Sequence, residues 1–418
     1  MNFLQKEAFA SFRYKDFNFF ILAKVLVTAA VQMQAVAIGW QIYDLTHDPL
    51  ALGLTGLAEA IPAISVALYG GYIADRVKRK FILQCATLVL SLASATLILF
   101  SHLGNAIPVS TFYLVIFTIG VARGFYGPAQ FALMSQLTAR KHYTNAAAWN
   151  STLWQLAAVS GPAIGGLIVG FAGYEITYIT IASLLVTALL LFSQIGNHNI
   201  DATDREEGIW DSIGKGWKFV YNQKMILGAL LLDMLAVLFG GATALLPMFA
   251  DKILAVGPQG LGFLRAAPGV GAFLIALVLT YRPPAKNAGR ILLACVGLYS
   301  LCMVAFALSE YFYLSLVILA FAGALDNVSV VIRHTILQLY TPENMRGRVS
   351  AVSTMFIGSS NEIGAFESGT AAKLLGLVPS VIFGGLTSLT SVFIVGAQFK
   401  SIRTLDLTKD PNAERQEL

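Results

Sequence analysis

Apolar residues dominate this chain in long runs that short polar turns separate. Each run has about 20 residues, which is the length that an α-helix needs to cross the hydrocarbon core of a bilayer. We therefore expect an all-α membrane protein. The pattern predicts twelve spans, at about residues 18–44, 51–74, 80–103, 108–130, 145–171, 174–196, 225–249, 257–281, 289–308, 311–338, 350–373 and 379–399.

The longest polar stretch, residues 197–224, divides the predicted spans six and six and ends in the pattern of an amphipathic surface helix. The halves resemble each other at an offset of about 200 residues, since Met134–Leu137 (MSQL) matches Ile336–Leu339 (ILQL). Two parallel repeats of six helices occur in secondary transporters. We expect an N-terminal bundle at 1–196, a cytoplasmic linker at 197–224, a C-terminal bundle at 225–400 and a tail at 401–418.

Composition supports this class, because only 12% of the residues are charged and 56% are hydrophobic, whereas soluble domains carry about 25% charged residues. Of the 28 lysines and arginines, 22 lie in the two tails and in the turns after even-numbered spans. Positive residues favour the cytoplasmic side, so both termini should be cytoplasmic. We expect a bacterial inner membrane protein, and no cleaved signal peptide is recognisable.

The three cysteines, Cys85, Cys295 and Cys302, lie in apolar runs without a CxxC pair, so we expect neither a disulfide framework nor a zinc site. The bases are spread over many turns, which gives no reason to expect nucleic-acid binding.

Four motifs carry a family resemblance. Residues 70–80 read GGYIADRVKRK, residues 123–127 read RGFYG, residues 161–166 read GPAIGG, and residues 342–349 read PENMRGRV. The first is similar to the signature between helices two and three of the major facilitator superfamily, with Lys78 at a usual glycine. The last resembles a loop in the branch of drug:proton antiporters that contains enterobactin and macrolide exporters. The resemblance covers nearly the whole chain and implies the twelve-helix fold in two pseudo-symmetric bundles.

The resemblance implies a cytoplasmic gate. Asp75 would face the positive N-terminal end of the predicted helix at 350–373. The other residues implied in this gate are Gly71, Arg76, Arg79, Lys80, Arg346 and Arg348. The alternative is that these charges only set the orientation of the chain.

The GPAIGG motif (Gly161, Pro162, Gly165 and Gly166) resembles the helix-five motif of antiporters in the superfamily. The resemblance implies a bend that favours antiport. The alternative is ordinary close packing of helices through small residues.

Eight ionisable residues lie well inside the predicted spans: Lys24, Glu59, Arg123, Asp233, Arg265, Asp326, Glu362 and Glu367. Each would cost about 2.5–3.5 kcal/mol at the bilayer centre. Eight such costs exceed the roughly 5–15 kcal/mol stability of a typical protein. We therefore expect most of them to face a cavity or each other.

We expect Asp233 and Asp326 to carry protons, with Arg123 as their switching partner, since a buried acid and a nearby arginine shift each other's protonation. Arg123 and Asp326 occupy nearly equivalent positions in the two repeats. Glu59 and Glu367 form a second candidate pair. Glu362 and Glu367 differ by about 140° around a helix, so they cannot both point into one cavity. The alternative is that each acid forms a static pair between helices.

Polar and aromatic side chains on the spans predict a mixed cavity for an amphipathic organic compound. The candidates are Lys24, Gln32, Gln34, Tyr126, Gln130, Trp154 and Asn327. Taken singly, such residues also serve as packing or interface residues.

We therefore expect a proton-coupled exporter of a siderophore or drug-like compound, monomeric, with the lipid bilayer, protons and the small-molecule substrate as its partners. No catalytic residues, resident metal or cofactor are predicted. Uptake, or transport of a metal ion or lipid, remains an alternative. A membrane-embedded enzyme or receptor is a further one, although the chain contains no HExxH, GxSxG or P-loop motif.

Overall fold

The computed structural model describes residues 7–74, 76–104, 107–134, 136–196, 209–282, 284–342 and 345–407. These residues form helices and turns, with no strand among them. The helices are η2(Glu7–Arg13), α1(Lys15–Thr46), α2(Pro49–Ala74), α3(Arg79–Leu103), α4(Val109–Met134), η4(Arg140–His142), α5(Tyr143–Gln194), α6(Ile209–Asn222), α7(Lys224–Gly240), η5(Thr243–Leu245), α8(Leu246–Met248), η6(Phe249–Ile253), α9(Gly257–Tyr281), α10(Ala288–Ala307), α11(Phe312–Tyr340), α12(Arg346–Leu375), α13(Leu377–Gln398) and α14(Lys400–Arg403).

The expected all-α membrane class is confirmed, since ten of the described helices are long and apolar enough to cross a bilayer. One of them, α5, has 52 residues, which is the length of two spans. Gly173 interrupts it with φ 79° and ψ −178°, a conformation that glycine alone adopts readily. The 30-residue α12 is not among the ten. The number twelve itself stays a prediction.

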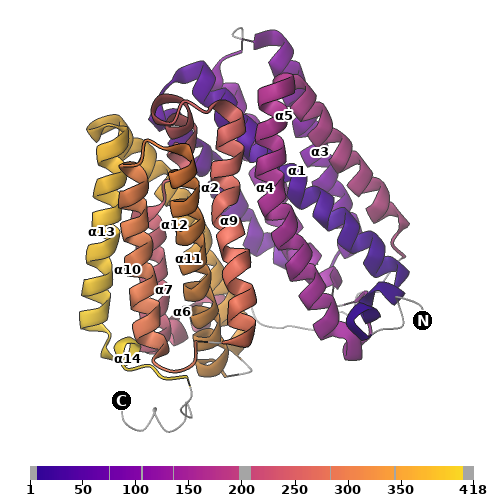
Figure 1. Cartoon of the computed structure of the whole chain (residues 1–418). Coiled ribbons are helices and arrows are strands. Elements are labelled where there is room, and N and C mark those ends of the chain that lie inside the picture. Colours follow the sequence, from indigo (N-terminus) through magenta and orange to yellow (C-terminus); the bar gives the residue numbers. More distant parts are fainter. Residues whose placement is uncertain are drawn as a thin grey trace. The chain divides into compact units, whose positions relative to one another are not determined.

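The chain forms two compact units, coloured by sequence in Figure 1. Unit 1 consists of Met1–His47, Ala58–Asp204 and Val256–Ala266, and unit 2 of Asp48–Leu57, Arg205–Ala255 and Ala267–Leu418. The first turns of α2 thus belong to unit 2, and those of α9 belong to unit 1. The bundle, linker and tail boundaries expected from the sequence stay predictions.

Glycines bring the backbones of unit 1 together. A Cβ on Gly161 would lie 2.8 Å from Gln32 Cβ, and one on Gly165 would lie 2.8 Å from Met33 Cα, so both glycines face α1. Gly166 makes an equally close approach to Gly262 of α9. Small residues permit such contacts between membrane helices. The GPAIGG segment therefore packs helices closely, and its suggested role in antiport stays a prediction.

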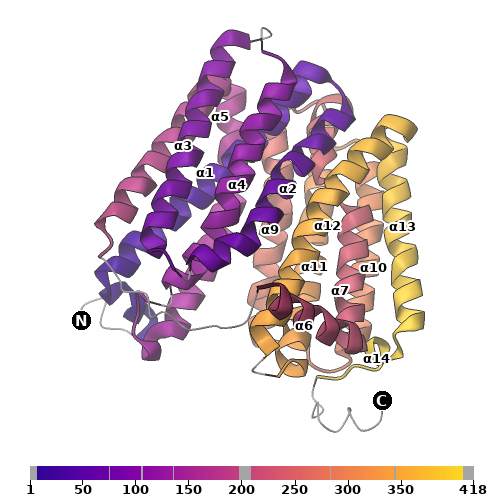
Figure 2. The ribbon, with the colours of Figure 1, turned by 180° about the vertical axis from the view of Figure 1, so that it is seen from behind.

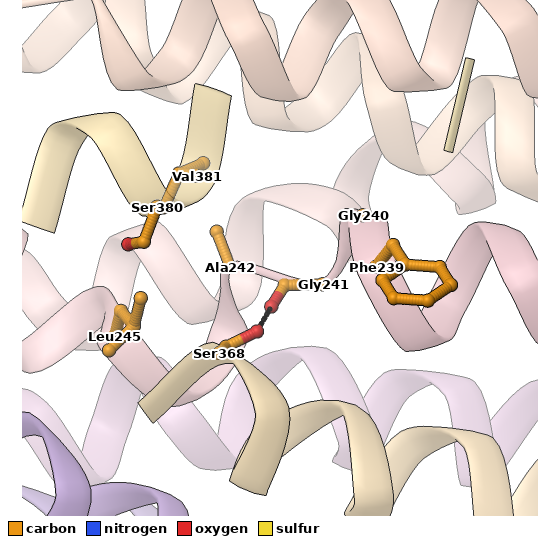
Figure 3. Close-up of a pocket in the computed structure, with 8 residues that line it drawn as sticks. All are labelled: Phe239, Gly240, Gly241, Ala242, Leu245, Ser368, Ser380 and Val381. Carbon is orange, nitrogen blue, oxygen red and sulfur yellow. Dashed lines mark hydrogen bonds between the residues drawn. The ribbon is translucent and has the colours of Figure 1, made fainter. Parts of the chain in front are cut away.

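In unit 2, the helix that begins with α7 is interrupted after Gly240. Gly241 is extended, and three short helical pieces, η5, α8 and η6, follow it. Ser368 Oγ of α12 donates a hydrogen bond of 2.9 Å to the Gly241 carbonyl oxygen at a small cavity (Figure 3). This bond satisfies a backbone acceptor that the break removes from the regular helical pattern.

The amphipathic helix expected before residue 225 is α6, which lies across the lower ends of α7 and α12 in Figure 2. Its Trp217 ring lies 5.2 Å from the Phe356 ring of α12. Gly216 allows close approach to the backbone of Arg348, at the start of α12. The polar segment between the two halves is therefore anchored on unit 2 at this end.

Candidate functional site: a shared arginine in unit 2

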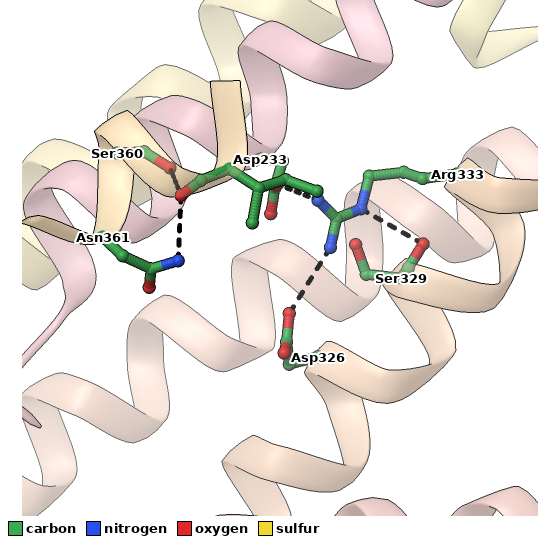
Figure 4. Close-up of polar contacts among 7 residues, drawn as sticks. Asp233, Asp326, Ser329, Arg333, Ser360 and Asn361 are labelled. Atoms are coloured by element: carbon green, nitrogen blue, oxygen red, sulfur yellow. Dashed lines mark hydrogen bonds and ion pairs between the residues drawn. The ribbon is translucent and has the colours of Figure 1, made fainter. Parts of the chain in front are cut away.

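Two acids and one base meet inside unit 2 (Figure 4). Arg333 of α11 forms an ion pair with Asp233 of α7 through its Nη1. Its Nη2 forms a second, longer ion pair of 3.6 Å with Asp326 Oδ1. Nε donates a hydrogen bond of 3.3 Å to the Ser329 carbonyl oxygen. One guanidinium thus joins two carboxylates and the backbone of its own helix.

The local structure explains why these groups meet. Asp326, Ser329 and Arg333 are spaced at i, i+3 and i+7, so they share one face of α11. Asp233 projects toward that face from α7, a helix that contacts α11. Neighbouring positions of α7 and α11 belong to the apolar core of unit 2, among them Leu232, Ala236, Val328 and Ile332.

The two carboxylates differ in their surroundings. The Asp233 side chain is 8% exposed, whereas the Asp326 side chain is 50% exposed. A small cavity touches both acids and is otherwise lined by Ala236, Val237, Val296, Tyr299 and Ser329. Asp233 is therefore the enclosed partner of Arg333. Asp326 is the more accessible partner, and its ion pair with Arg333 is longer. Such an arrangement can hold one proton at Asp326 while Arg333 stays neutralised by Asp233.

The sequence predicts Arg123 as the switching partner of these acids, and that role stays a prediction. Within unit 1, Arg123 forms an ion pair with Glu59. The Arg123 side chain is 46% exposed and the Glu59 side chain is 24% exposed. Two separate ion pairs between neighbouring helices thus occupy the two units. The proton-carrying role of Asp233 and Asp326 stays a prediction.

The other candidate acids lie on α12. Glu362 lies against α2, because its Oε2 is 3.1 Å from the point where a Cβ on Gly56 would stand. Glu367 is partly buried on α12, next to Ser368, whose hydroxyl group is bound to the Gly241 carbonyl oxygen. The five-residue spacing thus directs the two carboxyl groups to different surroundings. The pairing of Glu367 with Glu59 stays a prediction.

The gate motif is only partly described, since Asp75 lies outside the described residues. Arg79 donates a hydrogen bond of 3.1 Å to the Ala132 carbonyl oxygen near the end of α4. Lys80 donates to the carbonyl oxygens of Ser193, at 2.8 Å, and Ile195, at the end of α5. Basic side chains stabilise helix C-termini in this way. These two bases therefore hold the lower ends of unit 1 together.

The remaining gate residues lie on α2, in the turn after it, and at the start of α12. Arg76 is exposed, Gly71 lies within α2, and Arg346 begins α12. Arg348 contacts Met345 Sδ at 3.4 Å.

The residues expected to line a cavity differ in their surroundings. Gln34 is 2% exposed and donates a hydrogen bond of 3.1 Å to Ser94 Oγ of α3, so it joins two helices. Trp154 is 48% exposed. Three further candidates have a buried polar atom without a hydrogen-bond partner in the described residues, namely Tyr126 Oη, Gln130 Oε1 and Asn327 Oδ1. Lys24 and Gln32 are partly buried on α1.

Comparison with known proteins decides the family. The model of the transmembrane secretion effectors, a family of the major facilitator superfamily, matches residues 6–416. The chain belongs to this family. It is therefore a multi-pass membrane transporter of the major facilitator type and not an enzyme.

Curated relatives and solved structures agree with this membership. The enterobactin exporter EntS of Shigella dysenteriae serotype 1 is 28% identical over 375 residues, which cover 88% of each chain. The enterobactin exporter EntS of Escherichia coli O1:K1 has the same identity and coverage. A D-xylose-proton symporter superposes with a TM-score of 0.70 at 12% identity, over 91% of this chain and 96% of the other. A bacterial homologue of the iron transporter ferroportin superposes with a TM-score of 0.67 at 16% identity, over 93% and 98%. The two structures establish the fold.

Sequence reasoning missed Arg333 as the central residue of this transporter's acid cluster. The signal that could have found it is the seven-residue spacing from Asp326, which places both on one helical stripe. Its position near the end of a predicted span, next to His334, made it resemble an interfacial residue.

Proposed function

We propose that the chain is a proton-coupled exporter of a small amphipathic organic compound, of the siderophore type, that works by alternating access. The relatives are described as enterobactin exporters, which supports both the direction and the compound class. We further propose that it acts as a monomer in a bacterial inner membrane with both termini in the cytoplasm, because basic residues concentrate in the tails and the even-numbered turns.

The observation that carries the proposal is the position of Arg333 between Asp233 and Asp326. When Asp326 is ionised, the Arg333 guanidinium is paired with two carboxylates. When Asp326 takes a proton, Arg333 is held by Asp233 alone, and the local charge changes by one unit. A change in charge within a low-dielectric site alters the relative stability of two conformations. Proton binding and release at Asp326 would thus bias the two halves of the transport cycle.

The test is transport in proteoliposomes, with enterobactin as the probe and a pH-sensitive dye inside the vesicles. Asp326→Asn should abolish most of the proton movement driven by enterobactin, because an amide does not bind and release a proton as a carboxyl group does. Asp233→Asn should also abolish gradient-driven transport, because Arg333 then has no enclosed counter-charge. Glu59→Gln is the matched control, since it breaks an ion pair of unit 1 and should leave the proton dependence intact.

Unchanged pH-driven transport by both asparagine variants would remove the assignment of the proton site. Inward accumulation of the probe would instead support uptake. The described residues contain no group of three or more metal-ligating side chains, so no observation in them favours a metal ion as the substrate.

A further inference from the structure

The ionisable residues that lie well inside the spans of unit 1, away from the span ends, carry a surplus of positive charge. They are Lys24 of α1, Glu59 of α2, Arg123 of α4 and Arg265 of α9. The only acid among them, Glu59, already pairs with Arg123. Lys24 Nζ donates to a neutral group, Asn150 Oδ1, at 2.7 Å. Lys24 and Arg265 therefore form no ion pair with a carboxylate in the part of the chain that the structure describes.

Arg265 is the more unusual of the two. Its Nη2 lies 3.3 Å from the point where a Cβ on Gly39 would stand, so the guanidinium rests on the backbone of α1 at a glycine. Its Nε is buried and has no hydrogen-bond partner among the described residues. A buried donor without a partner destabilises the fold. Groups of this kind in native structures call for a functional explanation.

The two cations lie on one side of α1. Lys24 and Gly39 are fifteen residues apart, which corresponds to about 22 Å along the helix and about 60° around it. Gln32 lies between them, about 20° from Gly39. No hydrogen bond of the Gln32 amide is recorded in the described residues, so the amide is free to donate one. Along this side of α1 lie, in order of depth, the Lys24 cation, the Gln32 amide and, at Gly39, the Arg265 cation of α9.

We propose that the transported compound is an organic acid, and that Lys24 and Arg265 bind its anionic group at two successive depths along α1. This inference rests on the proposed function and specifies its substrate. An anionic group would neutralise each cation in turn, and Gln32 would donate a hydrogen bond between them. A cationic compound would instead meet two uncompensated positive charges.

The test measures equilibrium binding to the full-length transporter in detergent, where no proton gradient exists. Two fluorescent amphipathic probes of opposite charge are used, carboxyfluorescein as the anion and rhodamine 6G as the cation. The wild type should bind the anion more tightly. Arg265→Gln should weaken anion binding by about tenfold or more, because a hydrogen bond to a charged group is lost. Lys24→Gln should have a similar but smaller effect, and Arg265→Lys should restore most of the affinity.

Arg123→Gln is the matched control, since Arg123 already has a carboxylate and its loss should change the affinity for both dyes alike. Stronger binding of the cation by the wild type, or an unchanged dissociation constant for the anion in Arg265→Gln, would overturn the inference. Either result would leave gradient-driven transport intact, whereas a failure of proton coupling would leave dye binding unaffected. The two proposals can therefore fail independently.

Discussion

The two units share a backbone arrangement but differ in the charges that it carries. In unit 1, Gly120 of α4 lies against Pro62 and the carbonyl of Glu59 on α2. In unit 2, Gly323 of α11 lies against the backbone of Pro268 on α9. The glycines are separated by 203 residues and the prolines by 206, as expected for two copies of one repeat.

The charges around these equivalent contacts are reversed. Glu59 and Arg265 each stand three residues before the equivalent prolines, and Arg123 and Asp326 each follow the equivalent glycines by three. Well inside the spans, away from their ends, unit 1 holds one acid and three bases, and unit 2 holds four acids and one base, histidines aside. The two copies of the repeat therefore share their backbone contacts but carry opposite charges at equivalent positions. Binding of an anion and handling of protons can thus reside in different copies of the same framework.

The largest effect that would test this comparison is expected from the arginines. Arg333→Met leaves Asp233 enclosed and without its cation, and removal of one partner of a buried pair costs about 3–5 kcal/mol. Arg123→Met should cost clearly less, since both members of its pair are partly exposed. Thermal unfolding of the purified variants measures the difference. Addition of Asp233→Asn to Arg333→Met should recover part of the loss; equal effects of the two arginine substitutions would contradict the distinction between the units.

The shared backbone contact predicts an intermediate and equal effect. A methyl group at Gly120 or Gly323 would overlap the facing backbone, and crowding of a well-packed site costs about 1–3 kcal/mol. Gly120→Ala and Gly323→Ala should therefore lower the free energy of unfolding by similar amounts. Gly127→Ala is the control, because a Cβ there meets no atom within 4 Å. A neutral result at one of the two sites would show that the contact is not equivalent in both units.

The smallest effect is expected at the ion pair between Asp48 and Lys373, which lie 2.9 Å apart within unit 2. Partial burial raises the pKa of the Asp48 carboxyl. Hydrogen bonds from Lys373 and the Leu50 N–H, together with the charge of Lys373, lower the pKa by more, so that it lies below 3.8. A depressed pKa stabilises the fold above pH 3.8, and this stabilisation disappears as the pH falls through the pKa of the folded state.

Lys373→Met should thus lower the free energy of unfolding by less than about 1 kcal/mol, and this loss should be the same from pH 5 to pH 8. Unfolding curves over this range measure the cost, and the two proteins should converge in stronger acid. A difference that varies between pH 5 and pH 8 would assign the pair a role that its charges do not explain.

Much of the fold could be predicted from the sequence, because hydrophobic length and the repeat offset are local properties. Pro62 and Pro268 align the copies without any structure. The partners of the buried charges could not be predicted, since they depend on which helices face each other and on side-chain reach. Asp326 is short and finds Arg333 two turns along its own helix, whereas the longer Glu59 reaches Arg123 on the neighbouring helix. Glutamate and aspartate at equivalent depths thus lead to different pairs.

Gly173 has a practical consequence for topology mapping. The two spans within α5 are joined through one residue with φ 79°, and a Cβ there would meet open space, so the backbone conformation alone restricts what can stand at this position. An epitope or protease site inserted here would have to separate two helix ends that have no loop between them. Reporter tags for topology mapping should therefore be placed elsewhere, and labelling of a Gly173→Cys variant would give a distorted account of accessibility.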